Sequence, residues 1–265
     1  MRNRLRELLE AEPSVLGVFA TLRDPAVTEL AALAGFDFVL IETEHAALSL
    51  ETMEDHLRAA RAHGIGTLVR VPSGEPKGIL RVLDAGAEGV LVPHVGSAEA
   101  ARGAVEAVRY PPAGHRGMYA GSRAADYGAH GLGGAREVTD RLNRDTVLAV
   151  MVEDASGVDE LEEIAAVPGL DMIHIGPSDL SASLGRIGAR EQPEIAAAVE
   201  RLRGACAGNG IKWGFPVGNG AYPLTAAELR DLGAFMLTAG SEMGHLLEAF
   251  RATVTRAAEA APRPA

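Results

Sequence analysis

Cysteine is almost missing from the 265-residue sequence, which has a single thiol at Cys206. An internal disulfide is therefore excluded, and the composition suits a reducing compartment. No apolar run approaches the ~20 residues that a membrane-spanning helix needs. The charged start of the chain, "MRNRLRELLEAEPSV", lacks the apolar core of a signal peptide. We expect a soluble, cytoplasmic protein without a membrane partner.

Positive charge is also scarce, because 25 basic residues stand against 36 acidic ones, a net charge of −11. Nucleic acids and anionic membranes require a basic footprint on the protein, so neither is expected as a partner. Aromatic residues are few at 4%, whereas hydrophobic residues reach 47% and glycines number 31. This composition predicts one large core of small apolar side chains connected by tight turns.

A short apolar run followed by an amphipathic helical pattern recurs along the whole chain. The apolar runs cover residues 15–20, 36–42, 66–71, 89–95, 146–153, 171–176, 211–217 and 233–240. Such runs between helices indicate parallel strands buried on both faces. Their number favours a closed (β/α)8 TIM barrel over an open doubly wound sheet, and no G-x-G-x-x-G motif follows the first run. We expect one barrel domain over residues 1–265, with an N-terminal helix, a C-terminal helical tail and an inserted excursion at 110–145.

Polar and titratable residues lie at the ends of the apolar runs or directly after them, where such runs usually give way to turn residues. They are Glu42, Glu44, His45, Arg70, His94, Glu153, Asp154, Ser178 and Asp179. In a barrel of this type the active site is built from the C-terminal ends of the strands and the loops that follow. The sequence therefore predicts a rim of carboxylates, histidine and arginine, the inventory of a metal-dependent site for an anionic substrate.

Glu153 and Asp179 are the strongest pair on this rim, because they follow neighbouring strands. Two carboxylates suit a hard divalent cation such as magnesium or manganese and leave positions for substrate and water. The alternative is a salt bridge or a helix N-cap, for which the "PSDL" sequence with Ser178 is well suited. Spacing alone leaves both interpretations open.

His45, Arg70 and Asp84 also have two interpretations each. His45 is either a surface histidine or, among carboxylates, a general base near neutral pH. Arg70 lies among apolar residues in "TLVRVP", so it either pairs with a structural carboxylate or stabilises an oxyanion. Asp84 precedes the fourth run, in "RVLDAGAEGV", and its position indicates a structural role.

Several segments occur in order from about residue 15 to 245: "FVLIETEHA", "LVRVP", "LDAGAEGV", "RYPPAGHRG" and "GPSDLSASLG". Together they resemble the class II, metal-dependent pyruvate aldolases of the 4-hydroxy-2-oxoheptanedioate aldolase family, with "RYPPAGHRG" and "GPSDLSASLG" as specific signals and "LVRVP" and "LDAGAEGV" as supporting ones. It implies a (β/α)8 barrel of the phosphoenolpyruvate/pyruvate-type superfamily and a homo-oligomer, a hexamer or trimer of dimers that exchanges its terminal helix. It also implies a magnesium, manganese or cobalt ion, and a 2-oxo acid and an aldehyde as small-molecule partners.

The same resemblance implies a role for each motif residue. Glu153 and Asp179 match the metal ligands, and Asp179 also contacts the substrate. His45 matches the base, and Arg70 matches the arginine that binds substrate and stabilises the transition state. Asp84 matches an aspartate that raises the basicity of the histidine, contrary to its positional interpretation, and Ser178 matches a backbone contact to the pyruvate carboxylate.

Three residues depart from the family pattern. The family usually has Asp at the position of Glu42, a small residue at Tyr119 and glutamine at Met151. A methionine cannot make the hydrogen bonds of an amide, so substrate orientation and the acceptor aldehyde are expected to differ. The alternative functions are oxaloacetate decarboxylation, enolate cyclisation in biosynthesis, acyl-CoA cleavage by the same type of barrel, and a non-catalytic binding protein.

Overall fold

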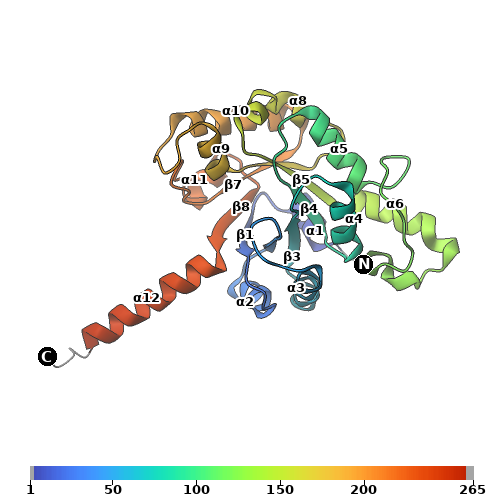
Figure 1. Cartoon of the computed structure of the whole chain (residues 1–265), viewed down its shortest axis with the longest axis horizontal. Coiled ribbons are helices and arrows are strands. Elements are labelled where there is room, and N and C mark those ends of the chain that lie inside the picture. The colour runs from blue at the N-terminus through green and yellow to red at the C-terminus, as the bar shows by residue number, and fades with distance from the viewer. Residues whose placement is uncertain (1–2, 261–265) are drawn as a thin grey trace.

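The computed structural model describes residues 3–260 and has a closed barrel of eight parallel strands in chain order (Figure 1). The strands are β1 (Val15–Ala20), β2 (Phe38–Glu42), β3 (Gly66–Arg70), β4 (Gly89–Val92), β5 (Val147–Val152), β6 (Met172–Ile175), β7 (Lys212–Pro216) and β8 (Met236–Ser241). Pairing of β8 with β1 closes the barrel. The predicted (β/α)8 fold is thus confirmed. Seven strands lie within their predicted ranges, and β8 ends one residue later.

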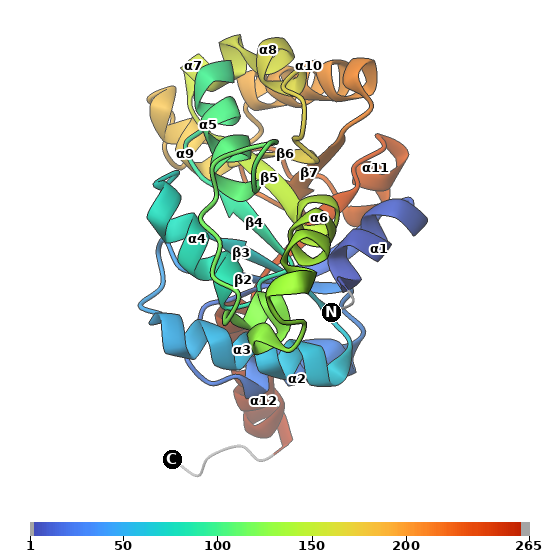
Figure 2. The same ribbon diagram turned by 90° about the vertical axis from the view of Figure 1, so that its right-hand side faces the viewer.

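Helices connect successive strands and surround the barrel, except that α1 precedes the first strand and α12 follows the last one (Figure 2). They are α1 (Arg4–Ala11), α2 (Ala26–Ala34), α3 (Leu50–His63), α4 (Pro76–Asp84), α5 (Ala98–Val108), α6 (Ala135–Asp145), α7 (Ala155–Asp159), α8 (Leu161–Ala165), α9 (Pro177–Ser183), α10 (Pro193–Asn209), α11 (Ala226–Asp231) and α12 (Glu242–Ala260). Within residues 3–260, no helix is long and apolar enough to span a membrane. The predicted single domain extends beyond this range, since 1–2 and 261–265 lie outside the described residues.

The excursion after α5 contains two short 3-10 helices, η1 (Arg123–Gly128) and η2 (Leu132–Gly134), before α6 leads into β5. This arrangement agrees with the insertion expected from the Gly- and Arg-rich sequence. In Figure 2 the segment runs beside α3 and α4, away from α9 and α10.

The barrel interior is filled by apolar side chains at alternating strand positions, including Phe38 of β2 and Leu68 of β3. Alternate residues of a strand point to opposite faces, so the other set packs under the helices. A side chain at Gly17 would overlap the ring of Phe38, which explains why this position of β1 is glycine. Leu5 and Leu8 of α1 cover the N-terminal end of the barrel and belong to the same buried cluster.

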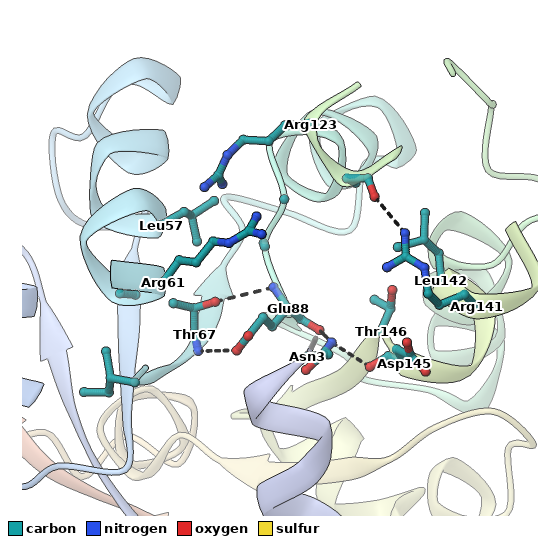
Figure 3. Close-up of a pocket in the computed structure, with 15 residues that line it drawn as sticks. Asn3, Leu57, Arg61, Thr67, Glu88, Arg123, Arg141, Leu142, Asp145 and Thr146 are labelled. Carbon is teal, nitrogen blue, oxygen red and sulfur yellow. Dashed lines mark hydrogen bonds between the residues drawn. The ribbon is translucent and has the colours of Figure 1, made fainter. Parts of the chain in front are cut away.

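Glu88 attaches α1 to this N-terminal end of the barrel (Figure 3). Its carboxylate accepts hydrogen bonds from the backbone N–H groups of Arg4 at 2.8 Å, Leu5 at 3.2 Å and Thr67 at 2.9 Å. Burial raises the pKa of Glu88, and these three donors oppose that effect. The carboxylate is therefore a structural link between the first helix and the barrel.

The C-terminal helix α12 projects from the barrel instead of packing along it (Figures 1 and 2). Its large apolar side chains are exposed along one stripe: Met243, Leu246, Leu247, Phe250 and Val254. Spacings of three and four residues place such side chains on one helix face. This chain alone leaves that face uncovered.

We predict that Leu8→Ala lowers the free energy of unfolding by about 2–5 kcal/mol, because a buried leucine would be replaced by a cavity. Leu33→Ala on α2, where the leucine is 74% exposed, is the control and should have a small effect. Urea unfolding followed by circular dichroism measures both changes. Equal effects of the two substitutions would contradict the role assigned to α1.

Candidate active site

A hollow of about 430 Å³ opens at the C-terminal end of the barrel. Its lining comprises Phe19, His45, Arg70, Met151, Glu153, His174, Gly176, Pro177, Ser178, Asp179, Pro216, Asn219 and Thr238. All eight strands are parallel and end at this side of the barrel, so the ends of several strands and the loops that follow them share one rim. Five residues predicted from the sequence therefore come together: His45, Arg70, Glu153, Ser178 and Asp179.

Glu153 follows β5 and is the most buried carboxylate in this hollow, with 3% of its surface exposed. Its Oε1 accepts a hydrogen bond from the backbone N–H of His94 at 2.8 Å. Its Oε2 packs against Gly176, where a Cβ atom would lie 2.6 Å away. Burial raises the pKa of Glu153, and the nearby charges of Asp179 and Glu44 raise it further. A cation beside this carboxylate would offset both effects.

Asp179 lies in the first turn of α9, and no ion pair of its carboxylate occurs in the described part of the chain. The N-cap of α9 is Gly176, without a side-chain capping hydrogen bond, so the alternative role of Ser178 or Asp179 as a helix cap is not realised. The first hydrogen bond of this turn runs from the Leu180 N–H to the Gly176 carbonyl at 3.0 Å. The N–H groups of Ser178 and Asp179 precede it and remain available to an anion.

The donor set at the rim fits a hard divalent cation. Among residues 3–260, no group of three His, Cys, Asp or Glu side chains forms a closed metal cage. Magnesium-type ions are commonly held by one or two carboxylates, with the other positions filled by substrate oxygens and water. Glu153 and Asp179, beside an open hollow, have the chemistry of that kind of site.

Arg70 ends β3 and forms a buried ion pair with Glu42, the last residue of β2. The Arg70 Nε lies 2.6 Å from the Glu42 Oε2, and 3.3 Å from the Glu44 Oε2. The other Glu42 oxygen accepts the backbone N–H groups of Glu44 at 2.7 Å and His45 at 2.9 Å. Glu42 therefore orients both the arginine and the turn that carries His45, while Arg70 Nη1 lies 3.8 Å from the Met151 sulfur.

The imidazole of His45 is 61% exposed at the rim, and its Nε2 lies 3.8 Å from the Glu44 Oε2. Asp84, by contrast, is the last residue of α4, whose C-terminal end lies toward the start of β4 at the opposite end of the barrel. There it pairs with Arg116, whose Nη2 is 2.8 Å from the Asp84 Oδ1. Within one chain, the contacts of Asp84 therefore match its structural interpretation. The predicted effect of Asp84 on the basicity of His45 has no support from contacts within one chain.

Of three further polar residues of this region, His94 was expected on the rim without an assigned role, and His174 and Thr238 were not selected from the sequence. His94 has a left-handed backbone (φ 53°), and its ring lies 3.3 Å from Glu44 and 3.4 Å from Glu153. His174 and Thr238 lie inside β6 and β8 and line the hollow. Both belonged to runs interpreted as buried strand, and only the alternation of inward and outward positions would have singled them out.

The three departures from the family pattern lie in different places. Met151 lines the hollow, whereas Glu42 is buried behind Arg70 and is not part of the lining. Tyr119 is largely exposed in the segment after α5 and does not line the hollow either. Within one chain, only the methionine changes the surface that a substrate would meet.

Comparison with known proteins supports a common ancestry over nearly the whole chain. The family model described as HpcH/HpaI aldolase/citrate lyase matches residues 15–249. The "Hydroxypyruvate/pyruvate aldolase" of Roseovarius nubinhibens is 36% identical over 96% of both chains. The "5-keto-4-deoxy-D-glucarate aldolase" of Klebsiella pneumoniae is 35% identical over 97% of this chain and 96% of its own.

A solved structure of an HpcH/HpaI aldolase/citrate lyase family protein from Burkholderia cenocepacia has a similar fold. It superposes with a TM-score of 0.87 at 33% identity, covering 97% of this chain and 99% of the other. Sequence, barrel and rim agree with the resemblance that the motifs indicated. The chain belongs to the HpcH/HpaI aldolase/citrate lyase family and is one of its aldolases, a carbon–carbon lyase with a (β/α)8 barrel of the phosphoenolpyruvate/pyruvate type.

Proposed function

We propose that the protein reversibly cleaves a 4-hydroxy-2-oxo acid into pyruvate, or a close 2-oxo acid, and an aldehyde, and that it requires a divalent metal ion. The observation that carries this proposal is the buried carboxylate of Glu153. It lines the hollow together with Asp179, and burial and the charge of Asp179 raise its pKa. The names of the relatives from Roseovarius nubinhibens and Klebsiella pneumoniae, both aldolases of oxo acids, support the substrate class.

Each residue has a distinct task in this proposal. Glu153 and Asp179 hold the magnesium, manganese or cobalt ion, which when bound polarises the oxo group of the substrate. The free N–H groups of Ser178 and Asp179 bind the substrate carboxylate. Arg70, held by Glu42 at 2.6 Å, keeps its positive charge beside the oxygen where negative charge develops.

His45 is the proposed base. Its exposed imidazole can accept the proton of the substrate 4-hydroxyl, directly or through water, as the carbon–carbon bond breaks. Glu44, 3.8 Å away, is the carboxylate nearest to this ring that the geometry provides. In the synthetic direction the same proton returns to the new alkoxide. The acceptor aldehyde stays open, although Met151 in the lining favours an uncharged one, since an unpartnered carboxylate is costly to bury.

We further propose a cytoplasmic homo-oligomer, a hexamer or trimer of dimers, assembled through α12. The apolar stripe of α12 is exposed in a single chain, and large exposed apolar patches usually mark an interface. A second copy of the same chain can bury this stripe in a symmetric assembly. A single cysteine allows no internal disulfide and so suits a reducing compartment, and burial raises the pKa of this thiol to about 12.

We predict that chelation abolishes turnover, that manganese or magnesium restores it, and that Glu153→Gln removes the response to metal.

A second prediction concerns stability without metal. Folding raises the Glu153 pKa, so the metal-free protein loses stability as the pH rises above the pKa of this carboxyl in the unfolded chain. The Glu153→Gln variant should therefore melt at a higher temperature than wild type in chelator at pH 7. Asp154→Asn is the matched control, because Asp154 caps α7 through the Gly157 N–H at 2.7 Å. Full activity of metal-free wild type would rule the metal site out.

For the base, we predict that His45→Ala slows aldol cleavage about 10²–10⁴-fold. It should slow exchange of the pyruvate methyl protons less, because that step does not need the 4-hydroxyl proton removed. Arg70→Ala should slow both reactions. His63→Ala, on a histidine at the end of α3, is the control. Steady-state kinetics and proton-exchange NMR measure the two steps, and a wild-type cleavage rate in the His45 variant would refute its assignment.

For the assembly, we predict that Phe250→Asp lowers the mass measured by light scattering after size-exclusion chromatography. A charge in the apolar stripe would oppose its burial against another copy. Glu248→Gln, an exposed change on the same helix, should leave the mass as in wild type. A wild-type protein that is monomeric at micromolar concentration would contradict the proposed oligomer.

A further inference from the structure

A recess at the N-terminal end of the barrel gathers positive charge in a protein whose net charge is −11. Figure 3 shows Arg61 of α3, Arg123 of η1 and Arg141 of α6 around this recess. Its volume is about 60 Å³, the space of roughly four water molecules. Glu88 and Asp145 are the acidic residues of the lining, so the three arginines exceed the carboxylates by one charge.

Arg123 has a buried charge that nothing in the described chain pairs. The residue is 9% exposed. Its Nη1 donates to the backbone carbonyl of Ala85 at 2.9 Å, and within residues 3–260 this is its one hydrogen bond, with no ion pair beside it. Its Nε and Nη2 remain as donors for a molecule in the recess. Because a buried charge is costly unless it is paired, an anion bound there would stabilise this arginine.

The chain places Arg123 in the recess by means of a strained turn. Residues 122–125 are buried, whereas much of the surrounding excursion is exposed. Asp126 and Tyr127 follow directly and are left-handed, with φ 54° and 55°, a conformation that only glycine adopts without cost. A Cβ atom at Gly86 would lie 2.9 Å from the Arg123 Nη1, so this glycine leaves room for the guanidinium. Strained backbone of this kind is found at ligand clamps.

Arg61 and Arg141 add positive charge on two other sides of the recess (Figure 3). Arg141 also donates to the Ala124 carbonyl and pairs with Asp126, both at 3.4 Å, and so connects α6 with the strained turn. Arg61 and Glu88 also line a wider hollow of about 450 Å³. The two hollows therefore adjoin, and a molecule with one group in the recess has space for its remainder in the wider hollow.

A phosphate group is the ligand that this arrangement fits. Guanidinium groups bind phosphate oxygens through paired N–H donors, and they keep their charge at any physiological pH. The arginines come from three different elements and surround the recess. The tetrahedral oxygens of a phosphate can meet donors from several sides, whereas the two oxygens of a carboxylate lie in one plane.

We propose that this recess binds the phosphate group of inorganic phosphate or of a small phosphate monoester. The bound phosphate would stabilise the contact between the excursion, α3 and the N-terminal end of the barrel. The site is independent of the proposed reaction, because no residue that lines the recess also lines the hollow at the rim.

Isothermal titration calorimetry with inorganic phosphate, in chelator and at constant ionic strength, measures the binding directly. We expect wild type to bind phosphate, and Arg123→Gln to weaken the binding about tenfold or more, because a hydrogen bond between charged groups is lost. Arg136→Gln is the matched control, since this exposed arginine of α6 pairs with Asp140 at 3.0 Å. Its affinity should stay within about twofold of wild type.

Glycerol 3-phosphate distinguishes the two sources of the phosphate group. Tighter binding of this ester than of inorganic phosphate would assign the site to a monoester, and tighter binding of inorganic phosphate would assign it to the free ion. Either result should depend on Arg123 in the same way, because both ligands place the same group in the recess.

Thermal melting is a second readout, and neither measurement uses turnover. Phosphate should raise the melting temperature of wild type and of Arg136→Gln, relative to chloride at equal ionic strength, but not that of Arg123→Gln. If Arg123→Gln does not fold, Arg123→Lys retains the charge without the planar fork and should bind phosphate more weakly than wild type. Absence of binding to wild type, or binding that the Arg123 variants leave unchanged, would overturn the site.

Discussion

The buried charge of Glu153 is the constraint on which the rest of the active site depends. The carboxylate has one backbone donor, at 2.8 Å, and its pKa is raised by burial and then by the charges of Asp179 and Glu44. Moving a charge out of water is costly unless it is paired. Gly176 permits this position and Asp179 adds a second carboxylate, so the rim provides oxygen ligands whose charge a divalent cation would offset.

Acidic residues at the two ends of the barrel differ in how their charge is compensated. Asp37, Glu88 and Asp171 precede strands and accept backbone N–H groups of the neighbouring strand or helix. The carboxylate oxygens of these three residues are therefore occupied by hydrogen bonds that connect neighbouring elements of the barrel. Glu153 and Asp179 follow strands, where the chain turns outward and fewer donors reach them. Position along a parallel strand therefore separates structural carboxylates from those available to a ligand.

Arg70 combines a structural role with a proposed catalytic one. Its pairing with Glu42 at 2.6 Å satisfies the buried guanidinium, and the same glutamate accepts the backbone of the His45 turn. The two interpretations of Arg70 are thus not exclusive: the structural ion pair holds in place the positive charge that the proposed chemistry needs. Burial, and then the positive charge of Arg70, lowers the pKa of His174 on the neighbouring side of the hollow.

Much of this architecture is predictable from the sequence because its signals are local. Continuous apolar runs define the strands, and polar residues directly after them define the rim, which is why Glu153, Asp179, Arg70 and His45 are found without coordinates. Asp84 is different, since its partner Arg116 comes from the segment beyond α5 and sequence spacing gives no sign of that contact.

Other features depend on packing between strands. His174 stands in a run that looks uniformly buried, and the space for its ring depends on Gly214 in the next strand, where a Cβ atom would lie 2.8 Å from the ring. The backbone of His94 reaches Glu153 only because β4 and β5 are neighbours in the barrel. Such contacts between distant segments are set by the register of the closed sheet, which apolar patterning does not specify residue by residue.

The most direct test of the central claim is anomalous diffraction at the manganese edge from crystals grown with manganese and pyruvate. The account predicts a peak bonded to one oxygen each of Glu153 and Asp179, with the oxo acid beside it and Arg70 on the side of its C2 oxygen. A manganese peak at another site, or bound pyruvate away from both carboxylates, would contradict it.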